Sequence, residues 1–275
     1  MKSPRHVYTA AGLLLLLATA LFSACASTGG RSGKNGGNPY YDDNIADFSA
    51  GALSNGIPVI YKQQQGKTAW LGLVIDGGVA FYPPEKSGLE EITLSLMLHG
   101  SQAYPYSEIQ RLQFEKSFSL SSSAGKDYSV ISSRFINRDL ESAVSMLADS
   151  LLHPLLTPED FATVMTEEAE SIQRTLSNPS GVLGLELAKS AYQGHTYATS
   201  VSPTASTISL ISLDDVQAHY QTLLNSARLA FVVVGDFKGK EQKKLTEMLE
   251  SYFGNLEDKG FEKATIAPLE ASRSE

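Results

Sequence analysis

The chain has 275 residues, and 42% of them are hydrophobic, which is enough to build a sizeable core. Asp and Glu number 30 against 22 Lys and Arg, so the formal charge of −8 disfavours nucleic acid as a partner of the folded part. Cys25 is the only cysteine, which excludes an intramolecular disulfide.

Residues 1–24 have the pattern of a signal peptide. Lys2 and Arg5 precede a short apolar run, and small residues follow it. The segment Phe22-Ser23-Ala24-Cys25 resembles a bacterial lipobox, with Phe22 standing where leucine is usual. We therefore expect a lipid on Cys25 and a membrane-anchored lipoprotein of the bacterial cell envelope, on its periplasmic or outer-membrane side. The alternative is an ordinary signal peptide with an incidental cysteine.

The next segment, 25–46, is rich in Ser, Thr, Gly and Asn and contains few apolar residues. Such a composition cannot bury enough surface to order itself. It predicts a flexible tether between the lipidated cysteine and a folded body.

The folded body opens with a predicted hairpin. Strands over 48–53 and 57–62 flank the turn Ser54-Asn55-Gly56, and Asn-Gly between apolar runs is a strong hairpin signal. A further strand over 70–75 ends at Gly77-Gly78. A helix over 87–98 follows, for which the sequence predicts Ser87 as N-cap with Glu90 completing a capping box.

The remaining elements alternate between strands and runs of helices. We expect a helix over 107–116 and strands over 119–123 and 128–135. Apolar spacing then predicts helices over 140–151, after Thr157-Pro158 and from Ser180. A helix capped by Ser212-Leu-Asp-Asp215, a buried strand over 228–234 and a polar-faced helix over 238–252 close the set.

This order predicts an α+β fold, in which an antiparallel-rich sheet carries helices packed on one face. The body is expected to form one domain over residues 47–255. Residues 256–275 are then a tail or a truncated interdomain linker.

Several catalytic motifs are absent from the sequence. Neither the nucleophile elbow Gly-x-Ser-x-Gly nor a phosphate-binding loop occurs. The four histidines of the body show no i, i+4 pair by which two imidazoles share one metal, and each is interpreted as an ordinary structural histidine: His99, His153, His195 and His219.

The order of motifs over residues 48–255 resembles the amino-terminal domain of the insulinase, pitrilysin and mitochondrial-processing-peptidase family. The matching segments are Leu53-Ser-Asn-Gly-Ile57, Gly77-Gly78, Ser87-Gly-Leu89, His99-Gly-Ser101, Leu151-Leu-His-Pro154, Asn178-Pro179, Gly194-His-Thr-Tyr197, Ser212-Leu-Asp-Asp215 and Val232-Val-Val-Gly-Asp236. The resemblance implies an insulinase-like peptidase fold. It also implies partners, because members usually contain two or four such domains and some work as pairs of one active and one inactive subunit.

Active members of this family carry an inverted zinc motif, H-x-x-E-H, on the helix that begins at the Gly-Leu pair. Laid on this chain without gaps, its three positions fall on Glu91, Leu94 and Ser95. The family's third ligand, a glutamate, falls on Ser171, with Glu168 and Glu170 close by. The motif is therefore degenerate, and we predict no catalytic residue, no metal ligand and no cofactor.

An unconventional metal site on Glu91, Ser95 and His99, which are spaced by four residues, is a weaker alternative.

The family's substrate-binding edge strand aligns with a serine-rich segment of this chain. Peptide binding along such an edge uses backbone hydrogen bonds, which require no particular side chains. Peptide binding can therefore outlast catalysis, although a serine-rich strand is equally consistent with a solvated sheet edge. The candidate peptide-binding residues are Ser119, Leu120, Ser121 and Ser122.

Three functions stay open at this point. The first is a lipid-anchored, catalytically inactive insulinase-like domain that serves as the partner or peptide-binding subunit of an envelope protease, paired with a second insulinase-like domain or an active peptidase subunit. The second is an active zinc-dependent metalloendopeptidase of this family with misaligned or unconventional ligands. The third is a structural surface lipoprotein.

Overall fold

The computed structural model describes residues 48–116 and 118–269. The predicted signal peptide, the lipidation site Cys25 and the tether lie outside the described residues. Within those two ranges no helix has both the length and the apolar character needed to span a bilayer.

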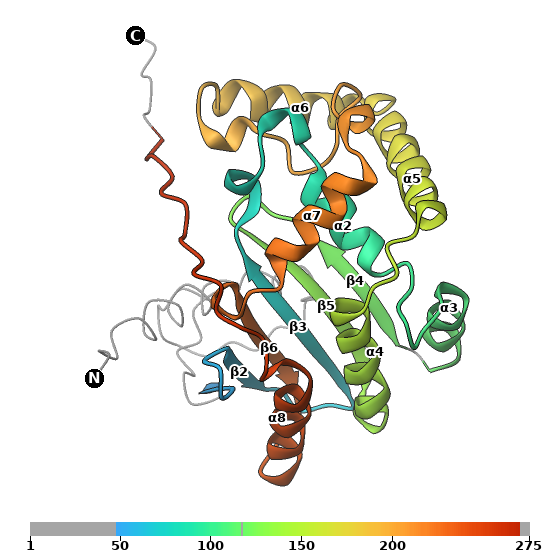
Figure 1. Ribbon diagram of the computed structural model, residues 1–275, viewed down its shortest axis with the longest axis vertical. Helices are drawn as coiled ribbons and strands as arrows, with labels where there is room; N and C mark the ends of the chain where they lie inside the picture. The colour runs from blue at the N-terminus through green and yellow to red at the C-terminus, as the bar shows by residue number, and fades with distance from the viewer. Residues whose placement is uncertain (1–47, 117, 270–275) are drawn as a thin grey trace, which may run out of the picture. The chain divides into compact units, whose positions relative to one another are not determined.

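The described part of the chain contains one sheet with the strand order β1-β2-β6-β3-β5-β4 (Figure 1). Neighbouring strands are antiparallel except for the parallel pair β2 and β6. The last strand along the chain, β6, is inserted in the middle of the sheet, and all seven of its residues are buried. The strands are β1 Phe48–Ala52, β2 Pro58–Gln63, β3 Thr68–Asp76, β4 Ser119–Ser123, β5 Tyr128–Ile136 and β6 Leu229–Gly235.

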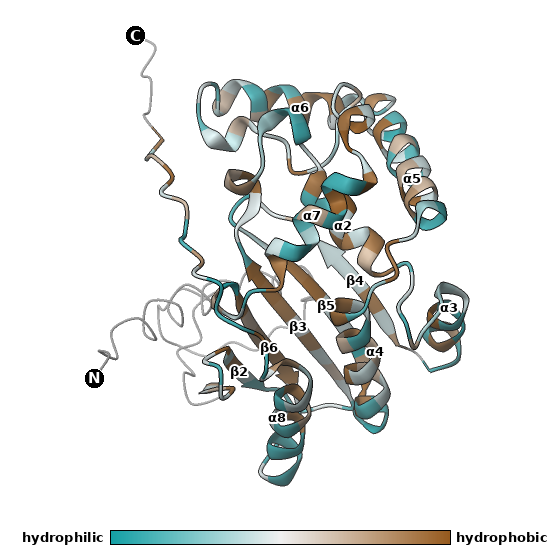
Figure 2. Cartoon of the chain, viewed as in Figure 1, coloured by the Kyte–Doolittle hydropathy of each residue, from teal (hydrophilic) through white to brown (hydrophobic). Residues whose placement is uncertain are grey.

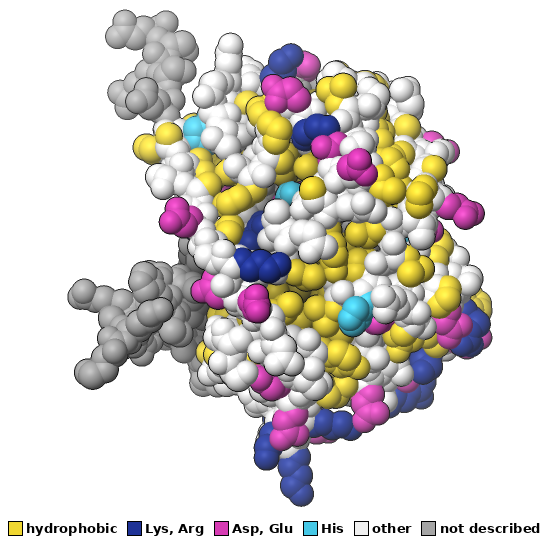
Figure 3. All heavy atoms as spheres, in the orientation of Figure 1, with side chains coloured by type: hydrophobic (Ala, Val, Ile, Leu, Met, Phe, Trp, Pro, Cys, Tyr) yellow, Lys and Arg dark blue, Asp and Glu magenta, His cyan; other side chains and the backbone are white. Residues whose placement is uncertain are grey.

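The helices lie over one face of this sheet (Figure 1), which confirms the predicted α+β class. Their sheet-facing sides are the more apolar ones (Figure 2). On the surface shown in Figure 3, apolar side chains are visible across the middle, and Lys and Arg side chains gather at the lower end, over α8. The helices are α2 Leu89–Met97, α3 Tyr106–Glu115, α4 Leu140–Leu152, α5 Pro158–Leu176, α6 Pro179–Ala191, α7 Leu213–Leu223 and α8 Lys240–Phe253.

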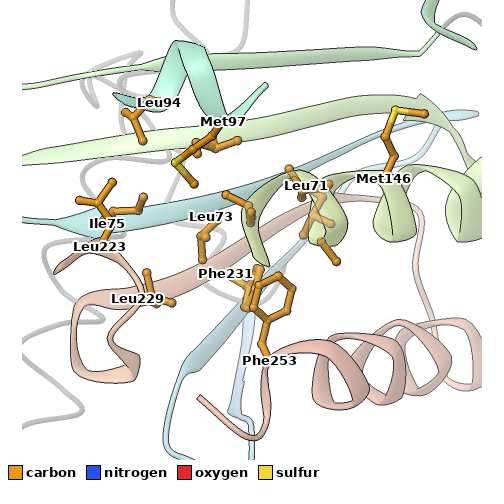
Figure 4. Packing of buried hydrophobic residues seen from close by; sticks show 14 of the residues in the cluster. Leu71, Leu73, Ile75, Leu94, Met97, Met146, Leu223, Leu229, Phe231 and Phe253 are labelled. Carbon is orange, nitrogen blue, oxygen red and sulfur yellow. The ribbon is translucent and has the colours of Figure 1, made fainter. Parts of the chain in front are cut away.

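The core fills the space between the sheet and these helices (Figure 4). Alternate residues of a strand point to the same face, so Leu71, Leu73 and Ile75 of β3 all enter this core and are at most 1% exposed. The ring of Phe253 at the end of α8 meets that of Phe231 in β6 at 4.9 Å between centroids. Each fully buried side chain of this kind contributes about 1.5–3 kcal/mol, so the core fixes the helices on the sheet.

Several predicted helix starts are confirmed by their caps. Thr157 accepts a hydrogen bond from the backbone N–H of Asp160, and Pro158 takes the first helical position of α5. Ser212 and Asp215 form the predicted capping box at α7. The hydrogen bond from Lys86 is the largest cause that lowers the pKa of Asp215 to about 2.

The start of α6 differs from the prediction. Asn178, not Ser180, is the N-cap, and its side chain accepts a hydrogen bond from the Ser180 N–H at 3.0 Å. Pro179 therefore occupies the first helical position, where its missing N–H costs nothing.

The predicted capping box at the start of α2 is wrong. The N-cap is Gly88, in the left-handed region at φ 91°, and a Cβ there would come within 2.3 Å of the Pro203 backbone nitrogen. The hydroxyl of Ser87 instead donates to the carbonyl of Pro84 at 2.7 Å. Glu90 is drawn away from the helix end because it binds two buried partners of other elements.

Glu90 is the central residue of a buried polar cluster that joins α2, β5 and α7. Its side chain is 1% exposed, and one carboxylate oxygen accepts a hydrogen bond from the Ser129 hydroxyl. The other oxygen accepts from Nε2 of His219, 3.3 Å away, whose residue is 6% exposed. A carboxylate can be buried only when such partners replace water. This cluster therefore fixes where α2 begins.

We predict that Glu90→Ala lowers the free energy of unfolding by about 3–5 kcal/mol, because it leaves Ser129 and His219 buried without their partner. Urea unfolding monitored by circular dichroism measures the change. The control is Glu85→Ala, at an exposed position of the preceding turn, which should change stability little. Equal effects of the two substitutions would contradict the role of the cluster.

Candidate functional site

Helix α2 places the three aligned motif positions on one face, as the i, i+3, i+4 spacing requires. Leu94 is fully buried in the core, while Glu91 and Ser95 are half-buried. One carboxylate oxygen of Glu91 is buried and has no hydrogen-bond partner among the described residues. The position of the family's general base is thus part of the hydrophobic core.

Helix α5 brings a second carboxyl group to this face. Burial is the largest cause that raises the pKa of Glu168 to about 7, and the charges of Glu91 and Glu167 raise it further. Arg174 acts in the opposite direction. A carboxyl group in such surroundings keeps its proton well above its usual pH range. Glu91 and Glu168 therefore form an electrostatically coupled pair.

Glu170, the other glutamate near the aligned third-ligand position, has a different contact. Its carboxylate lies 3.6 Å from the Arg174 guanidinium, and both side chains are about two-thirds exposed, at 67% and 69%. Of the two glutamates, Glu168 is the one coupled to α2. Alignment along the sequence does not distinguish Glu168 from Glu170, because the rotation of α5 about its axis decides which of its side chains face α2.

His99 lies just beyond the end of α2, and its contacts are with other elements. Its ring stacks on that of Tyr106 in α3 at 4.3 Å between centroids and 11° between planes. Its Nε2 lies 3.6 Å from a carboxylate oxygen of Glu167 in α5. The contacts of His99 with Tyr106 and Glu167 connect it to α3 and α5, and they do not join it to Glu91 and Ser95.

The other three body histidines also have identifiable contacts. His153 pairs with Asp149 at 3.1 Å, and His219 binds Glu90 as described. His195 donates from Nε2 to the carbonyl of Ala267 at 2.7 Å. The His153 contact lies at the end of α4, whereas the contacts of His219 and His195 join segments that are far apart in the sequence.

The residues on this face do not fit a catalytic zinc ion. Such an ion requires three protein ligands and a bound water. Here Leu94 offers no ligand atom, and Ser95 offers a neutral hydroxyl. No group of three His, Cys, Asp or Glu side chains that could hold a metal occurs within residues 48–116 and 118–269. We derive no reaction step through zinc for this chain.

The candidate peptide-binding residues lie on β4, at one edge of the sheet. Strand β4 pairs with β5 on one side, and on its other side the described part of the chain has no strand. Ser121 and Ser132 hydrogen-bond through their hydroxyls at 3.1 Å, which ties the side chains of the two strands. Ser119 and Ser121 are exposed, whereas Leu120 and Ser122 are half-buried. Within the described residues, β4 is thus an edge strand of the sheet.

We predict that Glu168→Gln stabilises the fold at high pH. In the folded state Glu168 holds its proton more tightly than in the unfolded chain, so its contribution is present below pH 4.5 and is lost as pH rises through about 7. At pH 8 the gain should be about 1–2 kcal/mol after allowance for partial exposure, and near pH 4 it should vanish. Urea unfolding across this range is the measurement.

The exposed Glu170→Gln on the same helix is the matched control and should leave the pH dependence unchanged. A Glu168→Gln curve parallel to that of the unmodified protein would contradict the coupling of Glu91 and Glu168.

Two similar proteins are subunits of the mitochondrial-processing peptidase. The beta subunit of Caenorhabditis elegans is 21% identical over 222 residues, which are 79% of this chain and 48% of that protein. The alpha-1 subunit of Dictyostelium discoideum is 22% identical over 221 residues, which are 78% of this chain and 33% of that protein. The chain therefore spans half or less of the length of these relatives.

Two solved structures share the fold. A peptidase M16 inactive domain from Pseudomonas fluorescens has a TM-score of 0.67 and 18% identity, and the match covers 77% of this chain and 52% of that one. A protease from Helicobacter pylori has a TM-score of 0.69 and 17% identity, with 81% of this chain and 53% of that one covered. In both structures the matched part is about half of the chain.

Two family profiles match consecutive parts of this sequence. Residues 58–205, more than half of the chain, match Insulinase (Peptidase family M16). Residues 210–274 match Peptidase M16 inactive domain. The first match includes α2 with its replaced zinc motif, and the second extends into the segment predicted as a tail. The chain therefore belongs to the insulinase family, peptidase family M16.

Proposed function

We propose that this chain is a non-catalytic insulinase-family domain that serves as the partner or peptide-binding subunit of a protease in a bacterial envelope. The observation that carries the proposal is the burial of Leu94 at the position of the general base. A base must reach the attacking water, and an aliphatic side chain inside the core can neither reach it nor accept a proton. Glu91 and Ser95 replace both zinc-binding histidines as well.

A role beside another subunit is supported by the relatives. Two of them are subunits of one peptidase, and this chain spans half or less of their length. In this proposal a second insulinase-like domain, or an active peptidase subunit, supplies the reacting groups. A lipid on Cys25 would hold the complex at the membrane.

Peptide binding is supported by the edge strand β4. An extended peptide can add to such an edge through main-chain hydrogen bonds. These bonds do not depend on the zinc motif, so this activity is compatible with the loss of the base. The serine hydroxyls of β4 leave the edge without bulky side chains that would block a peptide.

We predict that the purified full-length protein contains far less than one equivalent of zinc and does not cleave an unfolded protein when zinc is added. The donor set around Glu91 is too poor to hold the ion against solvent. Elemental analysis and a cleavage assay on reduced, carboxymethylated lactalbumin measure both properties. Stoichiometric zinc that is lost in Glu91→Ala or Glu170→Ala would establish the alternative, an active zinc endopeptidase.

We predict that the same unfolded protein binds along β4, and that one of two proline substitutions weakens this binding. Neighbouring residues of a strand direct their N–H groups to opposite sides, so Ser121→Pro and Ser122→Pro remove N–H groups on different edges. The substitution that removes an N–H group pointing away from β5 should lower the affinity for the unfolded protein. It should leave the melting temperature of the domain unchanged. The substitution on the β5 side should lower the melting temperature.

Fluorescence anisotropy and thermal unfolding separate these two effects. If neither substitution changes the affinity, or if no binding is detected, the edge strand has no peptide-binding role. That result favours the third function, a structural surface lipoprotein.

A further inference from the structure

The segment that follows α8 returns along the domain instead of leaving it (Figure 1). We call residues 256–269 the strap; it contains no helix or strand. Its first residues are held by backbone contacts. The side chain of Asn55 donates to the carbonyl of Leu256 at 2.9 Å, and the N–H of Ser226 donates to the carbonyl of Glu257 at 3.0 Å.

The next contact of the strap is an aromatic side chain placed against a buried cation. The ring of Phe261 lies 5.1 Å from that of Phe81. The guanidinium of Arg228 is 4.8 Å from the Phe261 centroid and 5.2 Å from the Phe81 centroid. A cation at such distances is attracted to both ring faces, and more strongly when water is excluded.

Hydrogen bonds to residues of the folded body hold the Arg228 side chain in place. The residue is 4% exposed, its Nε donates to the carbonyl of Asp76 at 2.8 Å, and Nη1 donates to the carbonyl of Thr222 at 2.8 Å. Its Nη2 is buried without a hydrogen-bond partner among the described residues. Gly77 leaves room for it, since a Cβ at that position would lie 2.2 Å from Nη2. The guanidinium is thus preorganised by body residues, independently of the strap.

Two polar contacts follow the aromatic one along the strap. Lys263 pairs with Asp76 at 3.1 Å. His195 then donates from Nε2 to the carbonyl of Ala267 at 2.7 Å. The proton is on Nε2 because Nδ1 accepts the backbone N–H of Tyr197 at 3.1 Å. The imidazole is therefore oriented by its own turn to bind a peptide carbonyl.

These contacts have the pattern of a bound extended peptide. An aromatic side chain packs against a ring and a guanidinium, a basic residue two positions later pairs with a carboxylate, and a main-chain carbonyl is bound further on. Only some side chains of the strap are partly buried. Phe261, Ala264 and Ile266 are half-buried, while Glu262, Lys263 and Thr265 are exposed.

We propose that Phe81, Arg228, Asp76 and His195 form a docking site for extended peptide segments that carry an aromatic residue followed two positions later by a basic one. We call this site the strap site, and the strap is its resident ligand. The strap site lies at the C-terminal end of β3 and the N-terminal end of β6, whereas the proposed peptide-binding edge is β4 at the end of the sheet. It is thus a second site, independent of the edge strand.

Attachment to the same chain favours the strap over a free peptide, because a tethered ligand has a high effective concentration. A segment of this composition on a partner would therefore bind when the strap is weakened or displaced. The strap site can therefore be tested with a separate peptide added to the protein.

The first test uses charge reversal in the full-length protein. Lys263→Asp should speed amide hydrogen exchange across the strap by about tenfold, because the strap then opens more often. Asp76→Lys combined with Lys263→Asp should restore slow exchange. Glu262→Lys, at the exposed neighbouring position, is the control and should leave exchange unchanged. Equal exchange in all four proteins would overturn the proposal.

The second test measures binding in trans. A fluorescent peptide of residues 256–269 should bind the full-length Phe261→Ala variant at least about tenfold more tightly than the unmodified protein, in which the strap already occupies the site. The same peptide with Phe261→Ala should bind neither protein. A peptide that carries Lys263→Asp should bind poorly to the Phe261→Ala protein. The same peptide should regain affinity for a protein that carries both Asp76→Lys and Phe261→Ala. Binding that is indifferent to these substitutions would overturn the proposal.

Discussion

The arrangement of the helices depends on the buried carboxylate of Glu90. It joins β5 through Ser129 and α7 through His219, and so sets the place and direction in which α2 crosses the sheet. A buried charge with two specific partners cannot shift by a residue without losing them. Because α2 also carries the aligned zinc-motif positions, the placement of these positions follows from this contact.

Once α2 is fixed in this way, the next residues on it have separate roles. Leu94 continues the core, and Glu91 faces Glu168 of α5. Burial, together with the charges of Glu91 and Glu167, raises the pKa of Glu168 to about 7, so this carboxyl group keeps its proton well above its usual pH range. The chain thus has the insulinase-family fold, with an aliphatic residue buried at the position aligned with the general base.

Two further polar contacts lie where the chain changes direction. Arg228 immediately precedes β6 and donates to the carbonyl of Asp76, and Lys86 pairs with the capping residue Asp215 at 2.6 Å. In both places a buried or half-buried charge joins segments that are far apart in the sequence. The strap uses the first of these charges, so the end of the described chain is connected to the centre of the sheet.

Sequence patterns alone predict the order of the elements, the apolar faces of the strands, and the caps at Thr157 and Ser212. These features depend on local periodicity and on hydrogen bonds between residues a few positions apart. The resemblance in sequence also aligns Leu94 with the general base of active family members. Three features come from the folded arrangement of the chain. Glu90 binds Ser129 and His219, Glu168 rather than Glu170 is electrostatically coupled to Glu91, and Phe261 of the strap lies against Arg228. Each of these depends on which surfaces face one another across the fold, and a linear pattern does not contain the rotation of one helix relative to the next.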